Sequence, residues 1–240
     1  MKVILRGPYK DDIVPLLLKH KITVVDDNPE LVIAYGGDGT LLGADREFPT
    51  IPKLALRDTR AAKLCGHHSH DKILNAMFSG ELQKSEIIRL LGKFQGKEVL
   101  AVNDIFIHNY HRVSAIRYRV YINGKVYLNE VASDAFGIAT PHGSTAYYRS
   151  ITHCIFTIGI GLAFSNSREN VNHIVLPDDV VIKVEILRGP ALMMADNSPD
   201  SFILNAGDCI EIDKFSKTAE VYGLEAFMCS DCRKLRHMKL

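Results

Sequence analysis

The sequence predicts an α/β N-terminal domain with a parallel sheet, followed by an all-β antiparallel sandwich domain. The N-terminal third alternates strand-like and helix-like segments, which is typical of a parallel sheet with helices on its faces. One fully apolar strand, Leu31–Tyr35, runs directly into a glycine cluster. After residue 95 the apolar residues recur with a period of two, and Asn123-Gly124 between two such runs favours a hairpin turn.

The elements of the first domain follow from hydrophobic periodicity. We expect strands at 2–5, 22–25, 31–35 and 52–56, and helices at 11–19, 40–48 and 71–78. Pro15 stands in the first turn of the first helix, and Gly80 follows the third helix as its C′ residue. Strands and helices in alternation predict a Rossmann-like sheet over residues 1–95.

The second domain is expected to span residues 96–225. Its period-two runs predict strands at 98–108, 114–122, 125–132, 136–139, 180–187 and 208–212. Residues 226–240 form a basic C-terminal tail, which we interpret as a solvated end of the chain, with a patch for a partner as the alternative.

Composition excludes several classes of protein. The 240 residues carry a net charge of +1, which gives no electrostatic reason to expect nucleic acid or an anionic membrane as a partner. No apolar run approaches the roughly 20 residues that span a bilayer. The five cysteines are an odd number without repeated spacing, so a disulfide framework is not expected. We therefore expect a cytoplasmic protein.

The first segment whose residue types suggest a functional site is Gly36-Gly37-Asp38-Gly39-Thr40. Glycines after a buried strand tolerate positive φ and let backbone N–H groups surround a phosphate. A carboxylate inside such a cradle repels phosphate, so Asp38 is better suited to a general base that accepts a proton from a hydroxyl. Thr40 is expected to cap the following helix. The alternative is a structural turn in which Asp38 is the N-cap.

The second stretch runs from Thr140 to Ser150. Ser144 and Thr145 are expected to start a helix whose N–H groups bind an anion. Tyr147 and Ser150 are three residues apart and share a helical face, where the ring can stack on a base or a nicotinamide. The alternative is a loop with an ordinary Ser/Thr cap.

The third stretch is an Asn103-Asp104 pair inside an apolar strand. Burying two polar side chains is costly unless they are hydrogen-bonded. The amide suits an adenine edge, and the carboxylate can accept from ribose hydroxyls. The alternative is a β-bulge or a polar pair at the start of a strand.

Together, the three stretches resemble the NAD kinase family. The family carries a GGDGT loop, a later Asn-Asp or Asn-Glu pair in an apolar strand and a TPTGSTAY segment, and the same order appears here at 36–40, 103–104 and 140–147. The resemblance extends from about residue 30 to about residue 150. Val175-Leu176-Pro177 and Ala195-Asp196-Asn197 resemble later family signals more faintly.

The resemblance implies transfer of a phosphoryl group to the adenosine ribose 2′-hydroxyl of NAD, which gives NADP. It also implies ATP or polyphosphate as the donor, Mg²⁺, and a homodimer or homotetramer. Asp38 would be the catalytic base, and Asp134 would bind the nicotinamide end. The implied binding residues for the phosphates, adenine, ribose and dinucleotide are Gly37, Gly39, Thr40, Asn103, Asp104, Thr145, Ala146, Tyr147 and Ser150.

The chain departs from the family pattern in four places: His142 replaces the threonine before Gly-Ser-Thr, Ala135 replaces the glycine after Asp134, and two longer segments differ. Ser150 is followed by Ile151-Thr152-His153-Cys154-Ile155-Phe156 instead of a run of small residues, glycine and proline. A glycine-rich segment expected after the second helix is replaced by 56–60, in which Arg57 and Arg60 can clamp phosphates or lie as plain surface residues.

Two groups of residues could ligate a metal, but each supplies only part of a tetrahedral site. The first is Cys65, His67, His68, His70 and Asp71, and the second is Cys229 with Cys232. Neither spacing closes a tetrahedral site by itself, so no metal-binding residues are predicted and the first group is interpreted as a polar loop that leads into a helix.

Two other functions stay open at this point. One is a kinase with a GGDG loop that acts on another hydroxyl substrate, such as a lipid or a sugar. The other is a non-catalytic dinucleotide-binding protein, which the altered run after Ser150 suggests.

Overall fold

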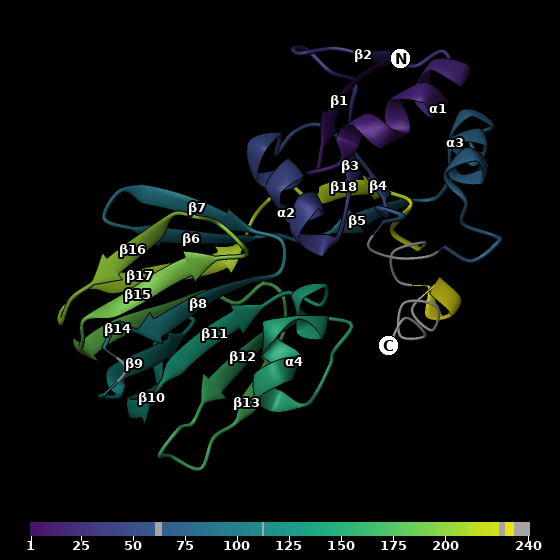
Figure 1. Cartoon of the computed structure of the whole chain (residues 1–240). Helices are drawn as coiled ribbons and strands as arrows, with labels where there is room; N and C mark the ends of the chain where they lie inside the picture. The colour runs from purple at the N-terminus through teal and green to yellow at the C-terminus, as the bar shows by residue number, and fades with distance from the viewer. Residues whose placement is uncertain (61–63, 112, 226–228, 233–240) are drawn as a thin grey trace. The chain divides into compact units, whose positions relative to one another are not determined.

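The computed structural model describes residues 1–60, 64–111, 113–225 and 229–232. It divides into two compact units (Figure 1). The first unit contains Met1–Ile87 and Ala219–Leu240, and the second contains Ile88–Thr218. The first holds a mainly parallel sheet with helices and the second holds two antiparallel sheets, so the predicted fold class is confirmed.

The sheet of the first unit has the strand order β2-β1-β3-β4-β18-β5. All neighbours pair in parallel except β18 and β5. Its strands are β1 (Lys2–Arg6), β2 (Thr23–Val24), β3 (Leu31–Tyr35), β4 (Lys53–Leu56), β5 (Lys84–Ile87) and β18 (Ala219–Tyr222). All five residues of β3 are buried, as expected for a strand covered on both faces.

Helices of the first unit pack against this sheet. They are η1 (Lys10–Ile13), α1 (Val14–Lys19), α2 (Asp38–Glu47) and α3 (His70–Phe78). The single helix expected at 11–19 is a short 3₁₀ turn followed by α1, because Pro15 lies at the start of the α-helix and cannot donate the hydrogen bond that would continue an earlier turn. A buried ion pair between Asp45 and Lys53 joins α2 to β4.

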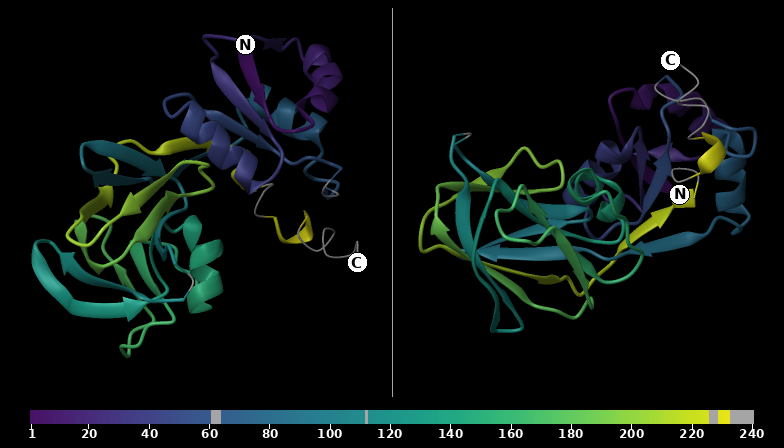
Figure 2. Two further views of the ribbon diagram at one scale, coloured as in Figure 1. Left: turned by 60° about the vertical axis from the view of Figure 1, so that its left-hand side comes forward. Right: turned by 90° about the horizontal axis from the view of Figure 1, so that it is seen from below.

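The second unit is a sandwich of two six-stranded sheets with the orders β10-β9-β14-β17-β6-β7 and β13-β12-β11-β8-β15-β16. Its core lies between the sheets and includes Ile105, Ile138, Val184 and Ile212. The bounds are β6 (Leu90–Phe94), β7 (Lys97–Ala101), β8 (Asp104–Asn109), β9 (Ile116–Ile122), β10 (Lys125–Ser133), β11 (Ala135–Ala139), η2 (Gly143–Thr145), α4 (Tyr147–Thr152), β12 (Ile160–Ser165), β13 (His173–Leu176), β14 (Ile182–Arg188), β15 (Ala191–Ala195), β16 (Ser201–Leu204) and β17 (Cys209–Lys214). Helix α4 lies beside β11 and β12 (Figure 1, Figure 2).

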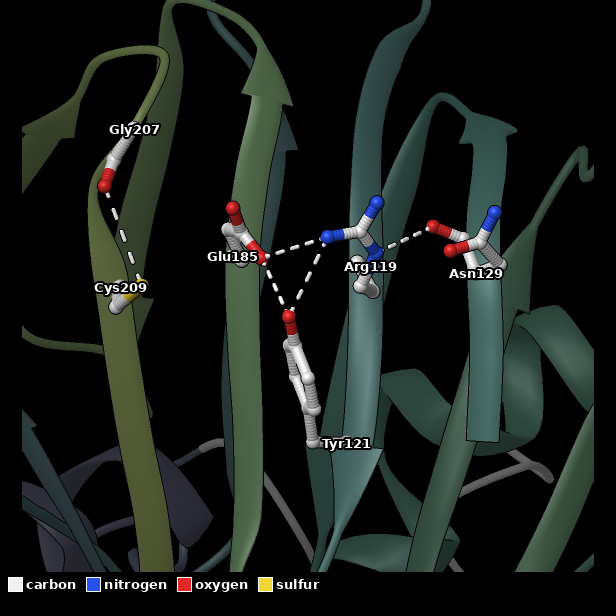
Figure 3. Close-up of polar contacts among 6 residues, drawn as sticks. All are labelled: Arg119, Tyr121, Asn129, Glu185, Gly207 and Cys209. Carbon is white, nitrogen blue, oxygen red and sulfur yellow. Dashed lines mark hydrogen bonds and ion pairs between the residues drawn. The ribbon is translucent and has the colours of Figure 1, made fainter. Parts of the chain in front are cut away.

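One sheet of the second unit carries a polar network on three neighbouring strands (Figure 3). The Tyr121 hydroxyl donates to Glu185 Oε2 at 2.7 Å, and Arg119 Nη1 lies 3.3 Å from the same oxygen. Alternation of these side chains with the buried Tyr118 and Val120 produces the period of two seen in the sequence.

The structure differs from the expected organisation in three places. The strand expected at 98–108 is interrupted at 102–103, where β7 ends and the chain passes to β8. The compact units divide at Ile87/Ile88 and Thr218/Ala219 instead of near residues 95 and 225, because β18 returns to pair with β4 and β5. Within the tail, Cys232 is buried and Cys229 is half-buried, so these two residues are not part of a solvated end. Ser230 and Asp231 are exposed, and residues 233–240 lie outside the described part.

No helix among the described residues is long and apolar enough to cross a membrane.

Candidate functional site

The turn after β3 is built from small residues because backbone and side chains approach closely there. The Gly36 N–H donates to Leu56 O at 2.8 Å, and a Cβ added at Gly36 would lie 2.2 Å from Thr40 Oγ1. Gly7, with φ +136°, ends β1 beside it, and a Cβ there would lie 2.0 Å from Tyr35 O. The carboxyl ends of β1 and β3 therefore meet in a crowded edge of the sheet, where ligands of open α/β sheets bind.

Two expectations about this turn are wrong. None of the glycines at 36, 37 and 39 has a positive φ, so the turn needs glycine for space rather than for a left-handed conformation. Gly37 is the N-cap of α2, with φ −99° and no side-chain cap. Thr40 therefore does not cap the helix, because its hydroxyl lies over Gly36, and Asp38 is the first helical residue rather than the N-cap.

Asp38 projects its carboxylate from the positive end of the α2 dipole. Its side chain is 66% exposed, and Arg57 Nη2 lies 3.3 Å from its Oδ1. The Arg57 side chain is only 10% exposed, so a largely buried guanidinium faces an accessible carboxylate. Arg60 instead forms a two-pronged ion pair with Asp12, with both N–O distances at 2.7 Å.

In the second unit, Asn103 and Asp104 lie where β7 passes to β8. Asp104 begins β8, so the polar pair stands at the start of a strand. Asn103 is 9% exposed, and its Oδ1 is buried without a hydrogen-bond partner among the described residues. A buried amide oxygen without a partner is costly, and a ligand N–H would satisfy it.

Asp196 holds this pair in place. Its carboxylate accepts backbone N–H bonds from Val102 at 2.8 Å, Asn103 at 2.7 Å and Asp104 at 3.1 Å. Burial, with a smaller contribution from the Asp196 charge, raises the pKa of Asp104 to about 8. The sequence motifs assigned no role to Asp196, although residues 195–197 weakly resemble a later motif of the family.

The turn at 140–146 packs on the same backbone. Thr140 N–H donates to Asn103 O at 2.8 Å, and a Cβ at Gly143 would lie 2.0 Å from that oxygen. The N–H groups of Ser144 and Ala146 are used inside the turn, by Thr140 O and Gly143 O. The expected anion site at the start of a helix is therefore wrong, because a tight 3₁₀ turn already satisfies those donors.

Aromatic rings and a pocket surround the start of α4. The Tyr147 ring lies 4.5 Å from the Phe106 ring and 5.6 Å from the His108 ring, with the latter pair stacked. Burial lowers the pKa of His108, which favours the neutral ring. Tyr147 and Ser150 line one pocket of about 460 Å³, so the predicted shared face is present. The sequence analysis did not identify Phe106 and His108. These two residues lie beside Tyr147 because they point to the same face of β8, which the sequence motifs do not indicate.

Asp134, Thr145 and Ala146 complete the predicted set. Asn166, which lines the same pocket, donates from Nδ2 to Asp134 Oδ2 at 2.8 Å. The exposed Thr145 donates its hydroxyl to His142 O at 3.1 Å, and Ala146 immediately precedes α4. The predicted residues thus gather into two sets: residues 37–40 in the first unit, and residues from 103 to 150 in the second.

No protein-family model matches the chain. Several curated NAD kinases match it at 26–35% identity. The chain is thus similar in sequence to NAD kinases. For example, NAD kinase of Agathobacter rectalis is 29% identical over 173 residues, which cover 68% of this chain and 61% of that protein. The chain spans between 44% and 68% of the length of the curated relatives it matches.

Two solved structures, of an NADH kinase and of an NAD kinase, share the fold. The crystal structure of yeast NADH kinase complexed with NADH has a TM-score of 0.79 at 17% identity, over 96% of this chain and 87% of that chain. The crystal structure of an NAD kinase from Archaeoglobus fulgidus in complex with ATP has a TM-score of 0.76 at 18% identity, over 98% and 99%. The fold resemblance therefore covers both units of the chain.

Proposed function

We propose that this protein is an NAD kinase, which transfers a phosphoryl group from ATP or polyphosphate to the 2′-hydroxyl of the adenosine ribose of NAD and releases NADP. The observation that carries the proposal is Asp38, an accessible carboxylate at the positive end of α2, beside the glycine turn and the Arg57 guanidinium. Curated NAD kinases that match this chain support the same activity.

In this proposal Asp38 is the general base. Its exposed oxygen accepts the proton of the 2′-hydroxyl as that hydroxyl attacks the terminal phosphorus of the donor. Gly37, Gly39 and Thr40 hold phosphate at the start of α2, and Arg57 offsets negative charge on the transferred group. The guanidinium also keeps Asp38 oriented through the 3.3 Å contact.

The second unit supplies the dinucleotide contacts. The unpartnered Oδ1 of Asn103 accepts from an adenine amino group, and Asp104 binds a ribose hydroxyl. Tyr147, backed by Phe106 and His108, stacks on a ring of the dinucleotide. Thr145, Ala146 and Ser150 line the dinucleotide site, and Asp134 binds the nicotinamide end.

The remaining parts of the proposal rest on the family resemblance. Mg²⁺ would enter with the donor phosphates, because it is usually held by one or two carboxylates together with substrate phosphates and water. The glycine turn at the start of α2, where the donor phosphates are proposed to lie, would place that ion, and Asp38 is kept as the base and not counted as a ligand. A homodimer or homotetramer is proposed, and the odd number of cysteines supports a reducing location such as the cytoplasm.

The test is NADP formation from NAD, ATP and Mg²⁺ by the full chain, compared with Asp38→Asn. This change keeps the size of the side chain and removes the proton acceptor, so we expect kcat to fall by about 10²–10⁴-fold with little change in NAD affinity. Asp26→Asn, an exposed carboxylate in the loop before β3, is the matched control and should keep wild-type activity.

Two outcomes would contradict the proposal. If the wild-type chain binds NAD but forms no NADP with ATP or polyphosphate, the protein binds the dinucleotide without catalysing the reaction. If the wild type is active and Asp38→Asn retains its kcat, the base is another group. Parallel assays with lipid and sugar acceptors check whether a different hydroxyl is the substrate.

A further inference from the structure

Four metal-ligating side chains from distant parts of the sequence meet in the first unit. Cys65 and His68 lie in the loop between β4 and α3, whereas Cys229 and Cys232 follow β18 near the end of the described chain. Their four ligand atoms all lie within 4.8 Å of one another. Each group alone has too few ligands for a tetrahedral metal site, but the fold brings the two groups together.

The separations match a tetrahedral site. Cys65 Sγ lies 3.2 Å from His68 Nδ1, and Cys232 Sγ lies 3.6 Å from the same nitrogen. With bonds of about 2.3 Å to sulfur and about 2.0 Å to nitrogen, the edges of a zinc tetrahedron are about 3.5 Å for sulfur to nitrogen and about 3.8 Å for sulfur to sulfur. Small side-chain rotations would bring all four atoms onto one ion.

The four ligands form a partly shielded group. Cys232 is 2% exposed, and the other three ligands are half-buried. The Cys65 backbone N–H lies 3.4 Å from Cys232 Sγ and donates toward it, which stabilises negative charge on that sulfur. The neighbouring His67 is exposed and is not part of the group.

We propose that Cys65, His68, Cys229 and Cys232 bind one Zn²⁺ ion in a closed structural site. Three thiolates and one imidazole in tetrahedral array are a typical zinc donor set, and soft sulfur ligands disfavour Mg²⁺ or Ca²⁺. Four protein ligands leave no open position for water or substrate. The site is therefore separate from the proposed phosphoryl transfer, and its ion is not a catalytic metal.

The zinc site fastens the segment after β18 to the β4–α3 loop. That loop begins at Arg57, whose carbonyl oxygen lies 2.7 Å from His70 Nε2 at the start of α3. The Arg57 side chain contacts Asp38, so ordering the loop also stabilises the surroundings of that carboxylate. Loss of zinc should therefore lower the stability of the first unit before it affects the second.

The first experiment measures metal in the full chain. We expect about one zinc ion per chain by mass spectrometry of the purified, reduced protein, as for other four-ligand sites. Cys232→Ser and Cys229→Ser should lose the ion, whereas Cys154→Ser and Cys209→Ser should keep it, since these two cysteines are exposed in the second unit (Cys209 is drawn in Figure 3). The two histidine variants form a matched pair, in which His68→Ala should lose the ion and His67→Ala should keep it.

A second measurement remains informative if a serine variant fails to fold. Replacing zinc by Co²⁺ in the wild-type chain should give the thiolate-to-cobalt charge-transfer band and the strong visible bands of tetrahedral Co²⁺. His68→Cys should retain the ion and shift those bands toward four sulfur ligands. Chelation of zinc should lower the unfolding temperature of the wild type and leave that of Cys232→Ser unchanged.

The proposal is overturned by any of three results. The first is that the reduced wild-type chain binds neither Zn²⁺ nor Co²⁺. The second is that Cys229→Ser and Cys232→Ser both retain the ion. The third is that the chain isolated under reducing conditions holds a Cys229–Cys232 disulfide in place of metal. None of these readouts depends on NADP formation, so failure of the kinase proposal would leave the zinc site intact.

Discussion

At the scale of single residues, Asp104 and Asp196 are neighbouring carboxylates in different surroundings, since Asp104 is buried and Asp196 is half-buried. Asp196 accepts three backbone N–H bonds, which hold its carboxylate beside the start of β8. Asp104 is buried close to that charge, and its pKa is raised to about 8. At neutral pH a protonated Asp104 can both donate to and accept from a hydroxyl, which suits the proposed contact with ribose.

The raised pKa of Asp104 predicts a pH-dependent stability. Between its ordinary value of 3.8 and about 8, the folded chain keeps a proton that the unfolded chain has lost. The free energy of unfolding should therefore fall as pH rises through this window, by at least about 1 kcal/mol. Calorimetric unfolding of the ligand-free chain from pH 5 to pH 9 measures this slope.

Asp104→Asn separates this effect from other titrations. The neutral amide has no proton to lose, so the variant should show a flatter stability profile and should be more stable than wild type at pH 9. Asp200→Asn, an exposed carboxylate in the same unit, should keep the wild-type slope. Equal slopes for wild type and Asp104→Asn would show that Asp104 is already ionised.

At the scale of elements, the turn at 140–146 is positioned by its fit against the start of β8. The Thr140 hydroxyl donates to Val102 O at 2.6 Å and accepts the Gly143 N–H at 3.0 Å, so one side chain links the turn to the neighbouring backbone. Ser144 extends the link, because its Oγ lies 2.9 Å from Phe156 O. The altered run after Ser150 is thus connected to the turn.

Gly143→Ala should displace this turn. The new methyl group would meet the Asn103 backbone at 2.0 Å, and backbone cannot move aside cheaply, so we expect a loss of about 1–3 kcal/mol in stability and weaker NAD binding. Thermal unfolding and calorimetric titration with NAD measure the two effects.

Gly43→Ala is the matched control in α2. Its new methyl group would be 3.8 Å from the nearest side-chain atom, on Arg46. Alanine is also the better helix former by up to about 1 kcal/mol, so this variant should be at least as stable as wild type. Wild-type stability and NAD affinity in Gly143→Ala would mean that the turn tolerates a side chain.

At the scale of the whole molecule, the two units differ in how the chain builds them. The second unit is one continuous stretch, Ile88–Thr218, with its own core between two sheets. The first unit is discontinuous, because β18 inserts between β4 and β5. Without β18, β5 has no partner strand in the described sheet, and the zinc ligands at 229 and 232 are also lost.

This topology predicts opposite behaviour for two truncated chains. Residues 88–218 alone should fold and unfold cooperatively, because the sandwich lacks none of its strands. Residues 1–218 should lose the cooperative unfolding of the first unit while keeping that of the second. Calorimetry and hydrogen exchange of both chains measure this. An unfolded 88–218 chain, or a first unit that stays as protected in 1–218 as in the full chain, would contradict the prediction.

Local sequence was enough to predict the features that depend on neighbouring residues. Leu31–Tyr35 is the buried strand expected from five consecutive apolar residues, and Asn123-Gly124 forms a turn with φ values of 49° and 77°. The period of two predicted the antiparallel strands because each side chain must face either the core or solvent. The three family motifs likewise lie within short stretches, which made the resemblance visible.

Features that join distant residues were decided only by the tertiary structure. The hydrogen bond from Asn103 to Asp196 spans 93 positions, and the contact between Cys65 and Cys232 spans 167. Spacing along the chain carries no signal for such pairs, because it is the order of strands in a sheet that brings them together. The placement of β18 beside β4 brings the two incomplete groups of metal-ligating residues together, with their ligand atoms within 4.8 Å of one another.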